Sequence, residues 1–326
     1  MKVFATSADP AGRFTRLREG NRGMRVTFWG VRGSYPVPGT ATVRYGGHTS
    51  CVQIDIPGKA PFVLDAGTGM RDLGRSLRST SLGRGEGHVN LFLTHLHWDH
   101  IQGLPFFEPV FSRGNRLNVW ARSGRGTKIN EAVSGVAGDA VFPIRFQELP
   151  ANFRFASVRP GEDFEVDGVR VRPFALNHPG TATGYRLDYG GASVAYITDT
   201  SPFDRIRYKK HFSKGPPKVL PSGDRKILNR MRKDLVEAVR GVDVAIYDTS
   251  FTDAEYEKLP HWGHSTPAHA LEIVKEAEAK SLVLFHHAPN RSDDEMDRIL
   301  AQTREAAAGS GIPVEAARQG LTLEAR

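Results

Sequence analysis

The segment of residues 95–100, His-Leu-His-Trp-Asp-His, constrains this chain more than any other feature. It places three imidazoles and one carboxylate within six consecutive positions, directly after the apolar run 91–93, which is typical of a buried strand. Neutral imidazoles and carboxylates are the ligands that borderline metals such as Zn²⁺ accept. Four donors this close in sequence cannot all reach one tetrahedral ion without severe backbone strain. A lone histidine is more often an ordinary surface or core residue, but this cluster predicts a loop that divides its ligands between two adjacent metal ions.

The composition is that of a globular enzyme. The chain has 326 residues, of which 39% are hydrophobic and 25% charged, enough for one large α/β domain or two average ones. No apolar run approaches the roughly 18 residues that span a bilayer, so we expect no membrane partner. The single cysteine, Cys51, excludes an intramolecular disulfide and fits a reducing compartment. We therefore expect a cytoplasmic protein. A homodimer is a further expectation, on which the sequence carries no signal.

The net charge of +8 favours anionic partners, either a small phosphodiester substrate or nucleic acid. Charge alone does not separate the two. Much of the excess lies in residues 1–23, which we expect to be a loosely ordered basic extension, and in residues 201–233. The prolines and basic residues of 201–233 predict an exposed insertion, which is either a nucleic-acid contact or a solvated loop without a role.

Strand-like and helix-like segments alternate along residues 24–326, which we expect to form one domain. Apolar runs predict strands at residues 25–29, 50–56, 62–64, 88–93, 117–121, 169–174, 185–189, 193–197, 242–247 and 281–285. Helical spacing is found at residues 70–77, 101–107, 232–240, 266–279 and 293–307. Strands followed by helices, twice over, predict an α/β fold. The expected architecture is a four-layer αββα sandwich, in which two mixed sheets pack face to face with helices on both outer surfaces.

These motifs resemble those of the metallo-β-lactamase-fold hydrolases. Residues 95–100 match the H-x-H-x-D-H motif of that family, residues 28–34 resemble the glycine-containing opening of its phosphodiesterase branch, and residues 64–69 resemble its D-x-G turn. That branch includes ribonuclease Z and the bacterial cyclic-phosphate phosphodiesterases. The resemblance runs from about Met24 to the C-terminus and implies the same four-layer fold.

The resemblance also implies a set of metal ligands for two divalent ions, Zn²⁺ first, with Mn²⁺ or Fe as alternatives. The first ion would be held by His95, His97 and His178. The second would be held by Asp99, His100, Asp199 and His286, with Asp199 bridging the two ions. His287 is an alternative to His286 as the last ligand. Asp65 is either an anchor for a ligating imidazole or an ordinary turn residue.

Three residues are expected to take part in catalysis. In the resembling enzymes a hydroxide shared by two metals attacks the phosphate. Asp99 is expected to be a catalytic residue in this step as well as a metal ligand. His264, in a His-Ser-Thr motif, is similar to the histidine that stabilises the scissile phosphate and protonates the leaving group. Asp248 would orient His264, although the family usually has Glu there. His264 also precedes a good helix start at Thr266 and Pro267, so a purely structural role is the alternative.

The leading hypothesis is a dinuclear metal-dependent phosphodiesterase that attacks a small or cyclic phosphate diester. Ribonuclease Z carries a long arm between its third metal histidine and its bridging aspartate, whereas here only residues 179–198 separate His178 from Asp199. An RNA or DNA nuclease of ribonuclease Z type, gripping its substrate through residues 201–233, is the first alternative. A lactonase, thioesterase or β-lactamase-like acyl hydrolase is the second. His264 and Asp248 argue against it, because acyl transfer needs no acid beside a phosphate.

Overall fold

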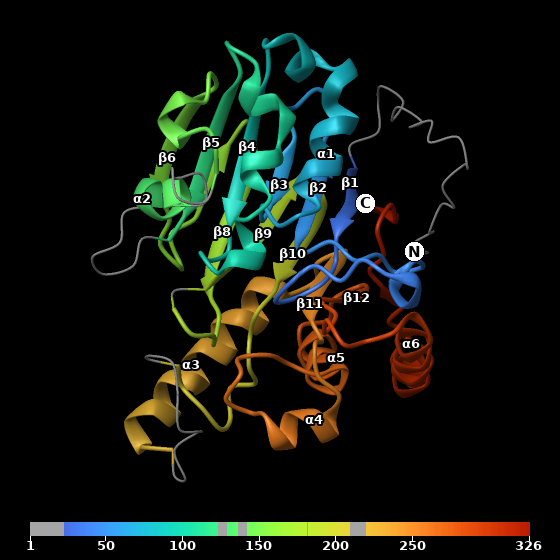
Figure 1. Cartoon of the computed structure of the whole chain (residues 1–326). Helices are drawn as coiled ribbons and strands as arrows, with labels where there is room; N and C mark the ends of the chain where they lie inside the picture. Colours follow the sequence, from blue (N-terminus) through green and yellow to red (C-terminus); the bar gives the residue numbers. More distant parts are fainter. Residues whose placement is uncertain (1–22, 123–128, 136–141, 181, 209–219) are drawn as a thin grey trace.

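The computed structural model describes residues 23–122, 129–135, 142–180, 182–208 and 220–326 (Figure 1). Nearly all of the expected basic extension, and residues 209–219 of the expected insertion, lie outside the described residues. In the described part, two β-sheets lie face to face and helices cover their outer sides. The predicted four-layer αββα sandwich is confirmed.

Each sheet has seven strands among the described residues. In spatial order, the first sheet consists of β14 (Thr322–Ala325), β1 (Met24–Gly30), β2 (Cys51–Asp55), β3 (Phe62–Leu64), β4 (His88–Leu93), β5 (Arg116–Ala121) and β6 (Asn152–Ser157). The second consists of β13 (Val314–Ala316), β12 (Leu282–Phe285), β11 (Val244–Asp248), β10 (Ala192–Ile197), β9 (Thr183–Tyr189), β8 (Val169–Ala175) and β7 (Phe164–Val166). Both sheets are mixed, with β3 to β6 parallel in one and β10 to β13 parallel in the other.

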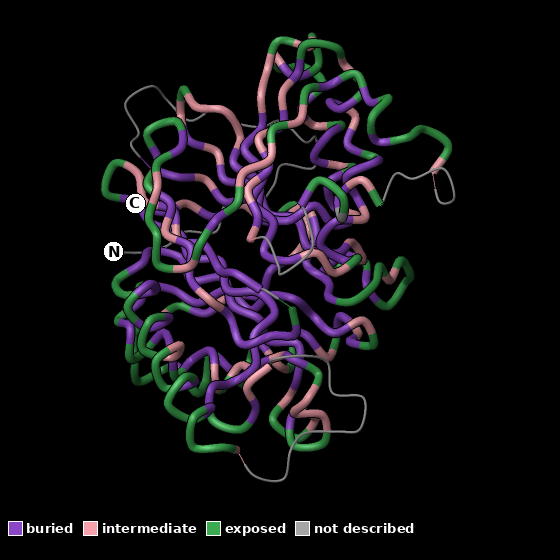
Figure 2. The backbone as a smooth tube through the Cα atoms, turned by 90° about the vertical axis from the view of Figure 1, so that its left-hand side faces the viewer, coloured by how far each residue is buried: buried purple, intermediate pink, exposed green. Residues whose placement is uncertain are grey.

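Three apolar cores separate the four layers. The central core lies between the sheets and includes Phe28, Phe92, Tyr196 and Phe285. A second core lies beneath α1 (Met70–Ser76) and α2 (Ile129–Ser134) on the first sheet. A third lies beneath α3 (Ser222–Val239), α5 (Pro267–Glu276) and α6 (Asp293–Ala307) on the second sheet. Figure 2 shows the buried segments running through the middle of the molecule. Strands β10, β11 and β12 are buried along their whole length, as expected for parallel strands covered on both faces.

The loops of the predicted site follow the carboxyl ends of strands. Residues 95–100 follow β4, and His178, Asp199 and His286 follow β8, β10 and β12. Strand β8 runs in the same direction as β10, because both are antiparallel to β9. The carboxyl ends of these strands therefore meet at one edge, which is where α/β sheets bind ligands. No helix of the described part is long and apolar enough to cross a membrane.

The structure corrects two element predictions. No α-helix opens at residues 101–107; this segment and the next contain short 3₁₀ helices, Leu104–Phe106 and Glu108–Phe111. Pro105 has no N–H for the bond to the Ile101 carbonyl that an α-helix over residues 101–107 would need. The helix predicted at 232–240 begins earlier, at Ser222, so the last part of the expected insertion is helical. Its buried face, with Leu228, Leu235 and Val239, packs on the second sheet.

Candidate metal centre

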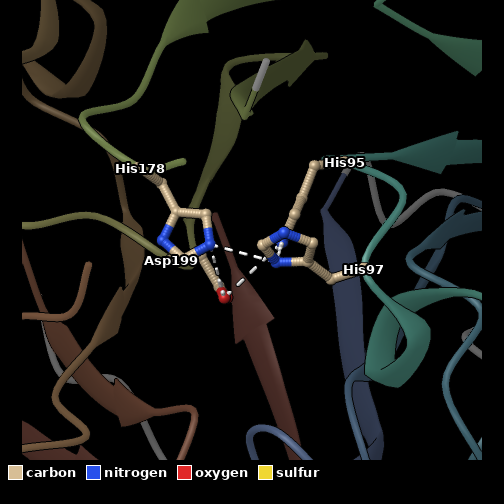
Figure 3. Close-up of side chains that lie close together, drawn as sticks. All are labelled: His95, His97, His178 and Asp199. Carbon is tan, nitrogen blue, oxygen red and sulfur yellow. Dashed lines mark hydrogen bonds and ion pairs between the residues drawn. The ribbon is translucent and has the colours of Figure 1, made fainter. Parts of the chain in front are cut away.

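Three imidazoles and one carboxylate converge at the carboxyl end of β4. One donor atom from each of His95, His97, His178 and Asp199 lies within 4.8 Å of all the others (Figure 3). His95 Nε2 and His178 Nε2 lie 2.9 and 3.2 Å from His97 Nδ1, and both lie 3.7 Å from Asp199 Oδ2. We call these residues the first cluster, and they include the three ligands that the sequence assigned to the first ion.

A second cluster lies on the other side of Asp199. It consists of Asp99, His100, Asp199 and His286, all buried, with donor atoms that also lie within 4.8 Å of one another. Asp199 Oδ1 lies 3.2 Å from His100 Nε2 and 3.1 Å from His286 Nε2. Asp99 Oδ2 lies 3.2 and 3.3 Å from the same two nitrogens. Asp199 therefore presents one carboxylate oxygen to each cluster, which is the arrangement expected of a bridging ligand.

The donor set fits divalent cations. Imidazole nitrogens seldom face one another unless a proton or a cation lies between them. His100 Nε2 is buried and lies 3.2 Å from both Asp99 Oδ2 and Asp199 Oδ1, yet it makes no well-aligned hydrogen bond with either carboxylate. Burial lowers the pKa of His178 to about 3 and the pKa of His95 well below its usual value, so both imidazoles are neutral and keep a lone pair. Burial opposes the charge of Asp199, but His286 and His100 hold its pKa well below its usual range. Neutral imidazoles and ionised carboxylates are the forms that bind metals.

Partners behind the clusters orient the donor atoms. His100 Nδ1 lies 2.8 Å from Asp65, which also accepts hydrogen bonds from the backbone and side chain of Thr94 and from Tyr196 Oη. His178 Nδ1 donates to the carbonyl of Gly263 at 2.8 Å. In both histidines, the nitrogen that turns away from the site is occupied, and this directs Nε2 toward Asp199. Asp65 is thus the anchor of an imidazole as well as a turn residue.

Four residues of the site have a left-handed backbone conformation. The non-glycine residues Ser34, Asp65, Asp199 and His286 have φ values of 63, 62, 51 and 59°. This conformation costs roughly 1–2 kcal/mol for an ordinary residue, and such strain persists at functional sites when the surroundings impose it. The Ser34 N–H donates to Asp99 Oδ2 at 2.7 Å, so one of these turns orients an acidic member of the second cluster. No motif or spacing in the sequence indicates this contact.

His286 and His287 lie in different surroundings. His286 Nε2 belongs to the second cluster, whereas His287 Nε2 donates to the carbonyl of Ala317 at 2.7 Å and the ring lies edge-on to Tyr45. Gly33 packs directly against His286: a Cβ at Gly33 would lie 2.4 Å from His286 Cε1. The structure therefore brings His286 to the cluster, as the sequence favoured, and turns His287 away.

His264 and Asp248 form a hydrogen-bonded pair beside the clusters. His264 Nδ1 lies 3.0 Å from Asp248 Oδ2, and Asp248, which is fully buried, also accepts the N–H groups of Thr200 and Ser250 at 3.0 Å each. Burial by itself would lower the pKa of His264, but the Asp248 carboxylate, with smaller contributions from Asp199 and Asp99, outweighs it and raises the pKa to about 9. Aspartate thus reaches His264 despite being shorter than glutamate. Thr266, not His264, caps α5, so the helix start and the His264 pair are separate features.

A cavity of about 650 Å³ opens over both clusters. His97, Asp99, His178, Asp199 and His264 reach its surface. The remaining lining residues are Ser34, Trp98, Pro179, His261 and Trp262. Metal-binding donors and a charged imidazole–carboxylate pair at the floor of one cavity, at the carboxyl ends of two stacked sheets, define a metallohydrolase of the metallo-β-lactamase type.

Comparison with known proteins agrees with this class. The Beta-lactamase superfamily domain matches residues 61–287, so the chain belongs to that family, and the resemblance stated from the motifs is confirmed. Ribonuclease Z of Halobacterium salinarum is 28% identical over 92% of this chain and 97% of its own length. Yeast PDE1 has a TM-score of 0.62 at 15% identity, covering 93% of this chain and 99% of that one. The short form of human tRNase Z has a TM-score of 0.58 at 19% identity, covering 91% and 98%. The prediction of a metal-dependent hydrolase is confirmed at this level.

Proposed function

We propose that this chain is a phosphodiesterase that hydrolyses a small or cyclic phosphate diester. The observation that carries the proposal is the placement of the His264–Asp248 pair beside two donor clusters that share Asp199. Relatives named ribonuclease Z, over nearly the whole chain, support phosphodiester chemistry.

We propose that the first cluster holds one divalent cation and the second cluster another, with Zn²⁺ as the first candidate and Mn²⁺ or Fe as alternatives. The ligands would be His95, His97 and His178 for one ion, Asp99, His100 and His286 for the other, and Asp199 for both. When bound, such a pair lowers the pKa of water and neutralises charge on a phosphoryl oxygen.

The chain's own residues have distinct roles in this proposal. His264 Nδ1 donates its hydrogen bond to Asp248, so Nε2 is the nitrogen that is left to donate a proton to the substrate. It would stabilise a phosphate oxygen and then give its proton to the departing oxygen. Asp99 lines the cavity and would accept a hydrogen bond from the attacking water. Its orientation depends on the Ser34 N–H.

The segment between His178 and Asp199 supports a small substrate. Strands β9 and β10 fill it as a hairpin closed by Gly190 and Gly191, so no arm for a large RNA is built there. This favours a small diester over tRNA. A nuclease remains the second candidate, because the net charge is +8 and the matched relatives are named as ribonucleases. Cytoplasmic location and a homodimer stay predictions.

The proposal is tested with metal-loaded protein on four substrate classes. We expect turnover of bis(p-nitrophenyl) phosphate and of cyclic nucleotides or cyclic ribose phosphates, no comparable turnover of lactones or β-lactams, and loss of activity on chelation. A steep salt dependence of substrate binding together with cleavage of short RNA would favour the nuclease instead. Full metal loading without hydrolysis of any phosphodiester would refute the proposal.

A further inference from the structure

Two tryptophans expose most of their surface at the mouth of the candidate site. Trp98 is 67% and Trp262 57% exposed, and both line the cavity over the donor clusters. The other two tryptophans of the chain are engaged within the fold: the Trp29 indole donates to Gln53 at 2.8 Å, and Trp120 stacks on Phe92 and Phe164. An exposed indole gives up a large favourable burial, so two of them beside the same polar floor indicate a contact with a ligand.

The backbone beneath each indole is fixed. Trp98 begins the 3₁₀ helix Trp98–His100, between His97 of the first cluster and Asp99 of the second, and its carbonyl accepts the N–H of Gln102 at 2.8 Å. A side chain mounted between two members of the metal site cannot drift away from it. The backbone that carries the Trp98 indole is therefore held beside the donor clusters.

Trp262 is fixed from the other half of the chain. Its N–H donates to the carbonyl of Leu259 at 3.1 Å, and the next carbonyl, that of Gly263, accepts His178 Nδ1. Tyr208, at the start of the predicted insertion, supports the loop that carries Trp262. Its Oη donates to the carbonyl of Pro260 at 3.0 Å. Each half of the fold thus contributes to the cavity one tryptophan whose backbone is held by hydrogen bonds.

A polar group beside Trp262 also lacks a partner. His261 lines the cavity, and its Nδ1 is a buried atom with no hydrogen bond among the described residues. Unsatisfied buried nitrogens are uncommon in native structures, so the orphaned Nδ1 sets His261 apart from an ordinary packed histidine. His261 and Trp262 are adjacent and both line the cavity, so a ring face and a polar side chain lie side by side there.

We propose that Trp98 and Trp262 are specificity-determining residues that stack against a planar aromatic ring of the substrate, so that the substrate is a phosphodiester that carries a nucleobase. This inference rests on the proposed function, because it places the scissile phosphate at the donor clusters. A cavity of about 650 Å³ has the size of a small-molecule site. Indoles stack on any base, whereas a cyclic ribose phosphate without a base would leave both rings in water.

The first experiment measures binding by calorimetry to the metal-loaded protein. The probes are adenosine 5′-monophosphate and ribose 5-phosphate, which share the sugar phosphate and differ in the base. Stacking predicts tighter binding of the nucleotide by roughly 5- to 150-fold. Trp98→Ala and Trp262→Ala should each reduce this ratio, and the Phe variants should retain most of it. Phe111→Ala is the control, because Phe111 is an exposed aromatic residue outside the cavity lining.

The second experiment compares two esters with the same leaving group, thymidine 5′-p-nitrophenyl phosphate and methyl p-nitrophenyl phosphate. The alanine variants should raise KM for the thymidine ester alone and leave kcat nearly unchanged, with metal content intact. If the wild type hydrolyses both esters with equal kcat/KM and binds both probes equally, stacking by Trp98 and Trp262 is refuted, and the phosphodiesterase proposal stands. If it hydrolyses neither ester but binds the nucleotide more tightly than ribose 5-phosphate, the stacking proposal stands and the phosphodiesterase proposal fails.

Discussion

Asp248→Asn tests whether His264 donates a proton during turnover. The change keeps the size of the side chain and removes the negative charge that His264 Nδ1 contacts at 3.0 Å. With Asp248 present, the His264 pKa is about 9. Without it, burial is opposed only by the smaller effects of Asp199 and Asp99, and the pKa of His264 falls toward its ordinary value of about 6.5.

The magnitude follows from these two values. A group with a pKa of about 9 is about 97% protonated at pH 7.5, whereas a group with a pKa of about 6.5 is about 9% protonated there. The rate with a poor leaving group should therefore fall about tenfold or more at pH 7.5. A proton donor acts only below its pKa, so the alkaline limb of the kcat profile should move to lower pH in the variant. Bound cations repel the imidazolium, so the limb of the wild type should itself lie below 9.

The assay compares a cyclic nucleotide, whose leaving group is a sugar alkoxide, with bis(p-nitrophenyl) phosphate, whose leaving group needs little protonation. Only the first should slow markedly, and metal content should be unchanged. Asp243→Asn is the matched control, because Asp243 is a buried carboxylate just before the start of β11, whereas Asp248 ends that strand. Equal losses on both substrates, or an unshifted alkaline limb, would refute the role of His264 as the acid.

Four further substitutions test the geometry of the centre. His286→Ala should remove about one bound metal ion per chain, measured by elemental analysis. His287→Ala should keep the metal ions but lower the unfolding free energy by about 1–3 kcal/mol, because the Ala317 carbonyl loses its hydrogen-bond donor. Equal metal loss in the two variants would contradict the assignment of His286 as the ligand. Gly33→Ala should weaken metal binding, because its Cβ would lie 2.4 Å from the His286 ring, and unchanged affinity in a metal titration would show that the loop yields. Asp65→Asn should lower metal affinity by about 10–100-fold, since His100 loses the carboxylate that directs its Nε2, and wild-type affinity would rule out that role.

Much of the centre could be predicted because its ligands follow apolar strands. Residues 95–100 directly succeed β4, and Asp199 and His286 lie within two residues of the ends of β10 and β12, so each ligand carries its own positional signal. The four strands with no counterpart in the sequence prediction, β6, β7, β13 and β14, are all at sheet edges. They are short or half-exposed, and their pairing depends on a neighbour that is distant in sequence.

Contacts made by the backbone were beyond sequence reasoning. The Ser34 N–H bond to Asp99 depends on a left-handed turn at a serine, and the Gly263 carbonyl bond to His178 depends on where a distant loop lies. Neither the residue type nor its spacing records such contacts. The exposure of Trp98 was equally hidden, since an aromatic residue between two ligands is as compatible with a core position.

Each donor cluster draws on both sheets. His95, His97, Asp99 and His100 come from the first sheet, whereas His178, Asp199 and His286 come from the second. Any cation bound there cross-links the two halves at the edge where their apolar core ends. Metal loading and the folding equilibrium are then thermodynamically linked, because the unfolded chain has no assembled site. The supply of metal in the cell would thus set how much of this protein persists in its native state, in addition to how fast that fraction works.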